Sequence, residues 1–443
     1  MKVAVISLGC PKNLVDSEVI LGELAQEKYS LTSKWFNADV VIINTCAFIR
    51  SAVREAEQWI KEVLAHKKLG KIRKVIITGC LVERYRQDLL KRFPEIDCIV
   101  SIDESFRINA VLKTSRKKLF ISTPPSRLLT SATPRIVTTN SFAYLKIADG
   151  CNNRCSYCLI PHLRGPFRSR SINDITEEAT LLVNLGIKEL ILIAQDTTLY
   201  GKDLYHKLML PNLLNRLLGI KDVHWLRLLY THPAHFTDQL ISLFHNAAKL
   251  CRYIDLPIQH VSDRILKLMN RKYTSRDLRK LLDKLHKIPN IAIRSTVIVG
   301  FPSETEKEFQ ELLDFVKTAQ FAHLGCFVYS QEKGTVAFKL PEQIPWKIKH
   351  ERYKEVMKVQ KNISQLRLKN FIGKELDVII DEELKTGVYS YKGRTEFDAP
   401  EIDGTVYIKC PKSATNYIRI GDIKKVKIID AGSYDLFGEI VTN

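Results

Sequence analysis

The chain of 443 residues contains no run of about 20 apolar residues, the length that a helix needs to span a bilayer. Apolar residues nevertheless make up 45% of the chain, which is ordinary for a globular protein. Residues 1–9 (MKVAVISLG) predict a strand and do not resemble a signal peptide. We therefore expect a cytoplasmic protein of two to four domains without a membrane span.

Acidic residues are in short supply, with 49 Asp and Glu against 68 Lys and Arg, which gives a formal net charge of +19. Such an excess suits a nucleic-acid or ribosome-facing partner. The basic residues are spread along the chain, however, and general lysine richness would look the same. The charge alone therefore does not choose a partner.

A cysteine-rich loop lacks a fourth thiol. Cys151, Cys155 and Cys158 follow an apolar run that predicts a strand over 142–148. A cubane iron–sulfur cluster normally takes four thiolates, so three would leave one iron open, which is the mark of a reactive site. The alternative is a Cys3His zinc site completed by His162.

The first 120 residues alternate strand and helix patterns, which predicts a parallel sheet. Each of the strands predicted at 2–6, 38–43 and 74–77 is followed within a few residues by a cysteine: Cys10, Cys46 and Cys80. Carboxyl ends of parallel strands share one edge, so a second three-thiolate cluster is expected there. The alternative is that these are buried strand cysteines, as we expect for the other four cysteines, 98, 251, 326 and 410.

Composition predicts the remaining boundaries. Residues 121–141 are rich in Pro, Ser and Thr and predict a linker. Residues 142–370 predict an open, partial (βα)6 barrel followed by an amphipathic helix from 346 to 370. Residues 371–443 predict a small antiparallel β-barrel. The predicted barrel strands are 142–148, 188–194, 224–230, 253–256, 291–299 and 322–328.

These motifs resemble known families. The C-x3-C-x2-C spacing, with Tyr157 before the third cysteine, resembles the radical S-adenosylmethionine (SAM) superfamily. With the second cysteine set, the chain resembles the methylthiotransferases. Residues 7–18 (SLGCPKNLVDSE) and 398–404 (DAPEIDG) resemble the branch that modifies ribosomal protein uS12, whereas the tRNA-modifying branch usually has Gln-Met-Asn after the first cysteine.

The resemblance implies a three-domain transferase with two 4Fe-4S clusters, SAM and a C-terminal TRAM-like domain. It implies that Cys151, Cys155 and Cys158 hold the SAM-cleaving cluster and that Cys10, Cys46 and Cys80 hold the sulfur-donating one. It places Tyr157, Gln195 and Gly300 near SAM. The implied product is a 3-methylthioaspartate in uS12, with electrons from a donor such as flavodoxin or ferredoxin. Residue 303 is Ser where the family usually has Gly.

Two other functions stay open. A tRNA adenosine methylthiotransferase would share the chemistry and the basic charge. A zinc-stabilised RNA-binding protein without catalysis would explain the charge and the cysteines. The segment 393–404 favours a protein substrate, because Glu396, Asp398, Glu401 and Asp403 would repel phosphates and complement a basic protein. A solvated acidic turn would look the same.

Overall fold

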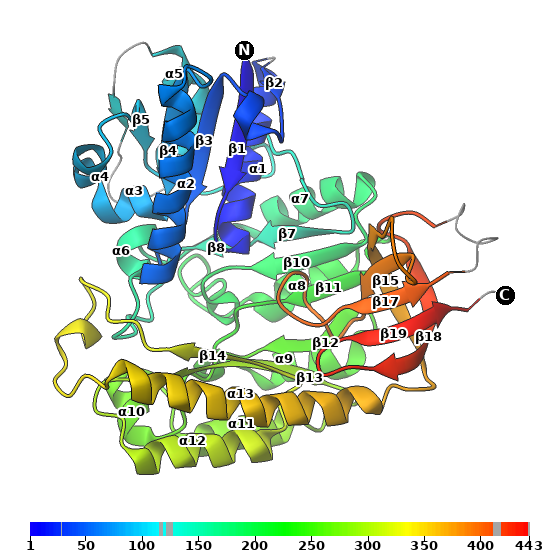
Figure 1. The fold of residues 1–443 in the computed structure, drawn as a ribbon. Coiled ribbons are helices and arrows are strands. Elements are labelled where there is room, and N and C mark those ends of the chain that lie inside the picture. The colour runs from blue at the N-terminus through cyan, green and yellow to red at the C-terminus, as the bar shows by residue number, and fades with distance from the viewer. Residues whose placement is uncertain (28, 115–117, 121–126, 411–417, 442–443) are drawn as a thin grey trace.

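The computed structural model describes residues 1–27, 29–114, 118–120, 127–410 and 418–441. The strands in these ranges form two six-stranded sheets, one closed barrel and a two-stranded ribbon. Figure 1 shows the N-terminal sheet in blue, the central sheet in green and the barrel in orange and red. The predicted α/β class is confirmed, whereas the predicted domain limits stay predictions.

Every strand pair of the N-terminal sheet is parallel. The strand order is β2-β1-β3-β4-β5-β6, so the chain direction across the sheet reverses between β1 and β3. Ligands of open α/β sheets bind at the carboxyl edge beside such a reversal. Three strands were predicted; the other three have only two or three residues and show no readable pattern. The strands are β1 (Lys2–Ser7), β2 (Ser30–Leu31), β3 (Val40–Thr45), β4 (Lys74–Gly79), β5 (Cys98–Val100) and β6 (Lys118–Phe120).

The helices of this region connect the parallel strands. Pro11 opens α1, where its fixed φ fits a first helical turn and its missing N–H costs nothing. The helices are α1 (Pro11–Gln26), α2 (Arg50–Lys68), α3 (Cys80–Tyr85), α4 (Gln87–Arg92) and α5 (Ile108–Lys113). No helix in the described ranges is both long and apolar enough to cross a bilayer.

The central sheet has six parallel strands in the order β14-β13-β12-β11-β10-β7, so each strand lies beside its predecessor in the chain. This arrangement confirms the predicted partial barrel. The strands are β7 (Phe142–Lys146), β10 (Glu189–Ile193), β11 (Trp225–Leu228), β12 (Leu250–Asp255), β13 (Ala292–Val299) and β14 (His323–Val328). The helices around it are α7 (Ile172–Asn184), α8 (Leu210–Leu218), α9 (Asp238–Asn246), α10 (Asp263–Leu268), α11 (Ser275–Leu285) and α12 (Glu306–Ala319).

The two faces of the central sheet have different neighbours. Side chains alternate along each strand, and residues such as Leu145 and Leu192 pack with the surrounding helices. The opposite face, which includes Tyr144, Trp225 and Tyr253, packs instead against α1 and against Ala399 of the C-terminal region. The inner face of the partial barrel is therefore filled by two other parts of the chain.

Helix α13 (Trp346–Lys369) confirms the predicted connecting helix and leads into the closed barrel. Four strand pairs of the barrel are antiparallel, as predicted, and one parallel pair, β17 with β19, completes the closure. The strands are β15 (Glu375–Glu383), β16 (Tyr391–Arg394), β17 (Val406–Lys409), β18 (Ile423–Ala431) and β19 (Leu436–Ile440).

Two of the four acidic residues between β16 and β17 face the central sheet, which corrects our expectation of an acidic surface for Asp398 and Asp403, whereas Glu401 is exposed. Asp403 accepts a hydrogen bond from Tyr253 Oη at 2.6 Å and pairs with Arg294 at 3.3 Å. Asp398 is also buried, and its carboxylate lies 3.5 Å from His323 Nε2. Arg294 and His323 of the central sheet bind these two carboxylates, so Asp398 and Asp403 are not available to a basic partner. Residues 395–403 act as a floor for the partial barrel, and we call them the floor segment.

The described part of the predicted linker is docked. Arg135 has a side chain only 6% exposed and pairs with Glu18 of α1 at 2.7 Å and with Glu178 of α7 at 2.6 Å. Glu18 also accepts hydrogen bonds from the N–H and hydroxyl of Thr138. The segment therefore ties the N-terminal sheet to the central one. Residues 121–126 of the predicted linker lie outside the described residues.

Candidate functional site

The loop with Cys151, Cys155 and Cys158 leaves the carboxyl end of β7 through the ribbon β8 (Ala148–Asp149) and β9 (Arg168–Ser169). Gly150 makes the turn with φ +81°, and a Cβ there would overlap the backbone of Pro166. The Cys151 N–H donates to the Gly165 carbonyl, and the Cys158 N–H donates to the Cys155 carbonyl. The backbone thus folds the three cysteines into one loop.

Burial governs the protonation of these thiols. It raises the pKa of Cys151 to about 11 and raises the pKa of Cys158 further, with charge on the neighbouring thiols adding to both shifts. Arg271 opposes this effect, and its Nη1 lies 3.5 Å from Cys155 Sγ. Cys151 and Cys158 without a metal are therefore protonated at neutral pH. A bound metal would have to displace those protons, as thiolate ligation requires.

The second set lies at the carboxyl edge of the N-terminal sheet, where the strand order reverses. Cys10 precedes α1, Cys46 follows β3 and Cys80 opens α3. Burial raises the pKa of Cys80 to about 12, and charge on Cys46 and Cys10 adds to the shift. Gly9 (φ +97°) is packed so closely that a Cβ there would lie 3.1 Å from Cys46 Sγ. The three cysteines therefore lie on neighbouring loops of one sheet edge, and their role as a ligand set stays a prediction.

Asn13 joins the loops that carry this second set. Its amide nitrogen donates to the carbonyl oxygens of Leu8 and Thr45, which precede Cys10 and Cys46. Its amide oxygen faces Cys80 Sγ at 3.9 Å. One buried amide therefore holds all three cysteine loops.

The two cysteine sets belong to one continuous network. Arg164, from α6 (Ile160–Arg164) just after the first set, donates to the same Asn13 oxygen and pairs with Asp16 of α1 at 2.8 Å. Lys146 of β7 also pairs with Asp16. Asp149 completes the network beside Arg164 and Lys146, whose charges hold its pKa well below the usual range against the effect of burial. The carboxyl edges of the two sheets are thereby fixed against each other.

The three residues that the resemblance places near SAM surround the cysteine loop, and their roles stay predictions. Tyr157 packs edge-on against Phe301, with ring centroids 6.5 Å apart. Gln195 donates to Asp149 Oδ1 at 2.8 Å, and its amide oxygen is buried without a hydrogen-bond partner among the described residues. Gly300 (φ +69°) donates its N–H to Glu304, and its Cα faces the stem of Lys349. Gln195 therefore has a free acceptor, whereas the Gly300 amide is occupied.

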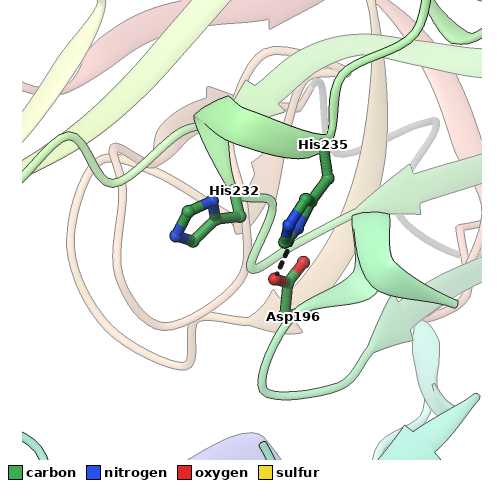
Figure 2. A group of neighbouring side chains, drawn as sticks. All are labelled: Asp196, His232 and His235. Atoms are coloured by element: carbon green, nitrogen blue, oxygen red, sulfur yellow. Dashed lines mark hydrogen bonds and ion pairs between the residues drawn. The ribbon is translucent and has the colours of Figure 1, made fainter. Parts of the chain in front are cut away.

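A cluster of Asp196, His232 and His235 supports the same loop (Figure 2). Asp196 Oδ2 accepts from Asn153 of the cysteine loop at 2.7 Å and lies 2.9 Å from His235 Nδ1. Its Oδ1 accepts from Thr198 and Leu199, so both oxygen atoms have partners. His232 Nδ1 accepts the Ala234 N–H. His232 is thus a loop hydrogen-bond partner, and Asp196 supports the cysteine loop.

Two other histidines lie near the site. His260 is buried and its Nδ1 accepts the Ser262 N–H, so it is a loop hydrogen-bond partner. His162 is exposed on α6. In the described ranges, no compact group of metal-binding side chains unites His162 with the three loop thiols. In that same part of the chain the three loop thiols do not form such a group with one another either, so the geometry does not choose between the iron–sulfur and Cys3His zinc predictions.

Sequence reasoning missed the charged residues around the thiols. Arg164, Arg271 and Asp149 gain their roles only when distant segments meet, and no spacing rule marks them. Asn13 was part of a motif, but its contacts to three loops could not be read from that motif. Ser303 has φ +62°, which explains why glycine suits this position.

Comparisons with known proteins agree with this arrangement. Residues 145–316 match the Radical SAM superfamily, residues 2–101 match the Uncharacterized protein family UPF0004 and residues 372–441 match the TRAM domain. The structure of the radical SAM methyltransferase TsrM from Kitasatospora setae has the same fold, with a TM-score of 0.53 over 74% of each chain at 15% identity.

Full-length relatives are much closer in sequence. The chain is 46% identical, over 99% of each chain, to the ribosomal protein uS12 methylthiotransferase RimO of Desulforamulus reducens. It is 45% identical to the protein of that name from Pelotomaculum thermopropionicum, over 100% of this chain and 99% of the relative. The chain therefore belongs to the ribosomal protein uS12 methylthiotransferase family of radical SAM enzymes, and it is a transferase.

Proposed function

We propose that this enzyme adds a methylthio group to the β-carbon of an aspartate in ribosomal protein uS12, with two 4Fe-4S clusters and SAM. The observation that carries the proposal is the pair of three-thiol sets on facing sheet edges, joined through Asn13 and Arg164. Full-length relatives carry the uS12 methylthiotransferase name, which supports the substrate. That substrate is ribosomal, so we propose a cytoplasmic location.

The donor sets fit the proposed cofactors. Each set offers three soft sulfur ligands, which suits iron–sulfur clusters with one iron left open. The unpartnered amide oxygen of Gln195, beside the first set, fits a ligand with N–H or ammonium donors, as SAM has. When bound, these groups would supply a radical able to remove hydrogen from an unactivated C–H bond, together with the sulfur and the methyl group.

The protein's own buried residues position the two cysteine sets. Arg271 would stabilise negative charge on Cys155. Asp196 and Asn153 would hold the first cysteine loop, and Asn13 would hold the second set. Arg164 would hold the two cysteine sets in a fixed position relative to each other. A reductant such as flavodoxin or ferredoxin would deliver electrons.

The two cysteine sets have separable roles, which gives a direct test. Cys158→Ala is expected to abolish SAM cleavage, since it removes a ligand of the cleaving cluster. Cys80→Ala is expected to spare SAM cleavage but to stop sulfur transfer to uS12. Chromatography of 5′-deoxyadenosine and intact-mass measurement of uS12 would read the two steps. Full thiolation by Cys80→Ala would overturn the assignment of the sets.

The substrate is tested in cells. Deletion of the gene should remove one methylthio group from uS12 and leave tRNA adenosines unchanged. An unchanged uS12 together with lost tRNA methylthiolation would instead support the tRNA-modifying alternative.

A further inference from the structure

Lys12 is a buried basic side chain that pairs with no carboxylate of the described residues; burial lowers its pKa, and charge on Cys10 opposes that shift. Lys12 is only 7% exposed, yet its Nζ forms no ion pair within 4.0 Å with a carboxylate of the described residues. Its Nζ makes one hydrogen bond, a long one of 3.4 Å to the Ala194 carbonyl, and lies 3.1 Å above the ring centre of Tyr230. Buried ammonium groups are normally paired because desolvation of an unpaired charge is costly.

The neighbouring carboxylates are already engaged. Asp149 pairs with Lys146 and Arg164. Asp255 pairs with Arg294 and accepts the Tyr230 N–H. Neither is free to neutralise Lys12.

A second buried lysine shows what a structural role looks like. Lys349 is also 7% exposed and also lacks an ion pair among the described residues, with its Nζ near the Tyr329 ring and carbonyl. Its stem, however, covers Gly300 so closely that a Cβ there would overlap it. Packing explains Lys349 and makes it a matched reference for Lys12.

The position of Lys12 is at the reacting edge. It lies two residues after Cys10, in the first turn of α1, at the reversal point of the N-terminal sheet. Ala194 and Tyr230 come directly after β10 and β11, at the carboxyl edge of the central sheet. The ammonium therefore lies where the two cysteine-bearing edges meet.

We propose that the Lys12 ammonium binds the side-chain carboxylate of the substrate aspartate. The inference rests on the proposed function, which makes an aspartate the substrate. The carboxyl carbon of aspartate is bonded directly to the β-carbon, so a carboxylate held by Lys12 would place the reacting carbon beside Ala194 and Tyr230, where the two cysteine-bearing edges meet. An ammonium has three donors, and only one is used, weakly, by Ala194. Charge-assisted hydrogen bonds in a buried site are strong enough to select an aspartate over an asparagine.

The test compares two changes that remove the same contact. uS12 binding is measured by titration with the cluster-loaded enzyme, for wild-type uS12 and for uS12 with the modified aspartate, identified by peptide mass spectrometry, changed to Asn. For the wild-type enzyme, that change should weaken binding about 10- to 100-fold. Lys12→Met keeps the chain length and removes the charge. It should weaken uS12 binding to the same extent and then show no difference between the Asp and Asn proteins.

Controls separate this effect from a folding defect. Lys12→Arg keeps a cation and should retain a clear preference for Asp, while Lys349→Met should retain the full preference. Iron and sulfide content is measured for each variant. If Lys12→Met does not hold its clusters, the Lys12→Arg result decides: loss of the Asp preference in that variant, with clusters intact, overturns the proposal.

The outcomes distinguish the inference from the function it rests on. A wild-type enzyme that neither binds nor modifies uS12 would overturn both the proposed function and the role of Lys12. A wild-type enzyme that modifies uS12, with a Lys12→Met variant that still prefers Asp over Asn by the same factor, removes only the role of Lys12.

Discussion

Replacing Glu189 with Gln should detach the floor segment from the central sheet. Glu189 is fully buried at the start of β10, and its two oxygen atoms accept from Arg227 Nε at 2.6 Å and from Arg394 Nη2 at 2.8 Å. Arg394 belongs to β16 of the C-terminal barrel and keeps Asp381 as a partner. Arg227 would keep no carboxylate partner among the described residues, only carbonyl oxygens of the floor segment at 2.8 and 3.3 Å and the ring of Tyr253. An unpaired charge would thus remain buried.

The magnitude follows from that unpaired charge. Breaking one side of a buried ion pair costs about 3–5 kcal/mol. Since each 1.36 kcal/mol is a factor of ten, local opening should become roughly 160- to 5,000-fold more frequent. Hydrogen–deuterium exchange of peptides covering 391–403 measures this opening directly. Exchange in the N-terminal sheet should stay unchanged.

A matched control is available on the surface. Glu382 pairs with Lys392 at 3.2 Å, with the two side chains 57% and 34% exposed, and Glu382→Gln should cost about 0–1 kcal/mol. Exchange in Glu189→Gln that is no faster than in Glu382→Gln would refute the reasoning. Burial raises the pKa of Glu189, but the charges of Arg394 and Arg227 hold it below its ordinary value of 4.5. Its stabilising contribution should therefore be complete above that value and decline as the pH falls below it.

Two further predictions concern a backbone turn and a helix cap. Gly150→Ala should lose the iron of the first cysteine set, because a Cβ would overlap the Pro166 backbone. Gly186→Ala is the control: Gly186 has φ +94° and open space around it, so this change causes the same backbone strain of about 1 kcal/mol and should leave the iron content unchanged. Equal iron content in both variants would contradict this. Burial raises the pKa of Glu308, but hydrogen bonds, first that of Arg264, lower it to about 2 from 4.5. Glu308→Gln should therefore lower the free energy of unfolding at neutral pH by about 1 kcal/mol, measured as a lower urea midpoint. The difference in stability between the variant and the wild type should shrink as the pH falls from 4.5 towards 2. A difference that stays constant over this pH range would contradict the prediction.

Local patterns were enough to predict the parts of the site that lie along single strands. Cys10, Cys46 and Cys80 each follow an apolar run, and parallel strands bring such positions to one edge. The same reasoning placed Cys151 and its neighbours after β7. Short strands such as β5 were not predicted, because three residues are too few to show an alternating pattern.

Interactions between distant segments could not be predicted in this way. Residues 393–404 looked solvated because acidic residues dominate them, but Arg294 and His323 lie far away in sequence and draw Asp398 and Asp403 inward. The segment around Arg135 looked flexible from its Pro, Ser and Thr content. Its single arginine meets Glu18 and Glu178, which no local rule connects to it.

The floor segment also has a consequence for how the protein is made. Domains form from the N-terminus as the chain leaves the ribosome. The inner face of the central sheet, with Trp225 and Tyr253, must then wait for residues 395–403 before it is fully covered. All six cysteines of the two sets, in contrast, have been translated once α6 has emerged, although Asp196 and Arg271, which contact the first cysteine loop, come later. The last part of the chain to be translated therefore finishes a domain that was started much earlier.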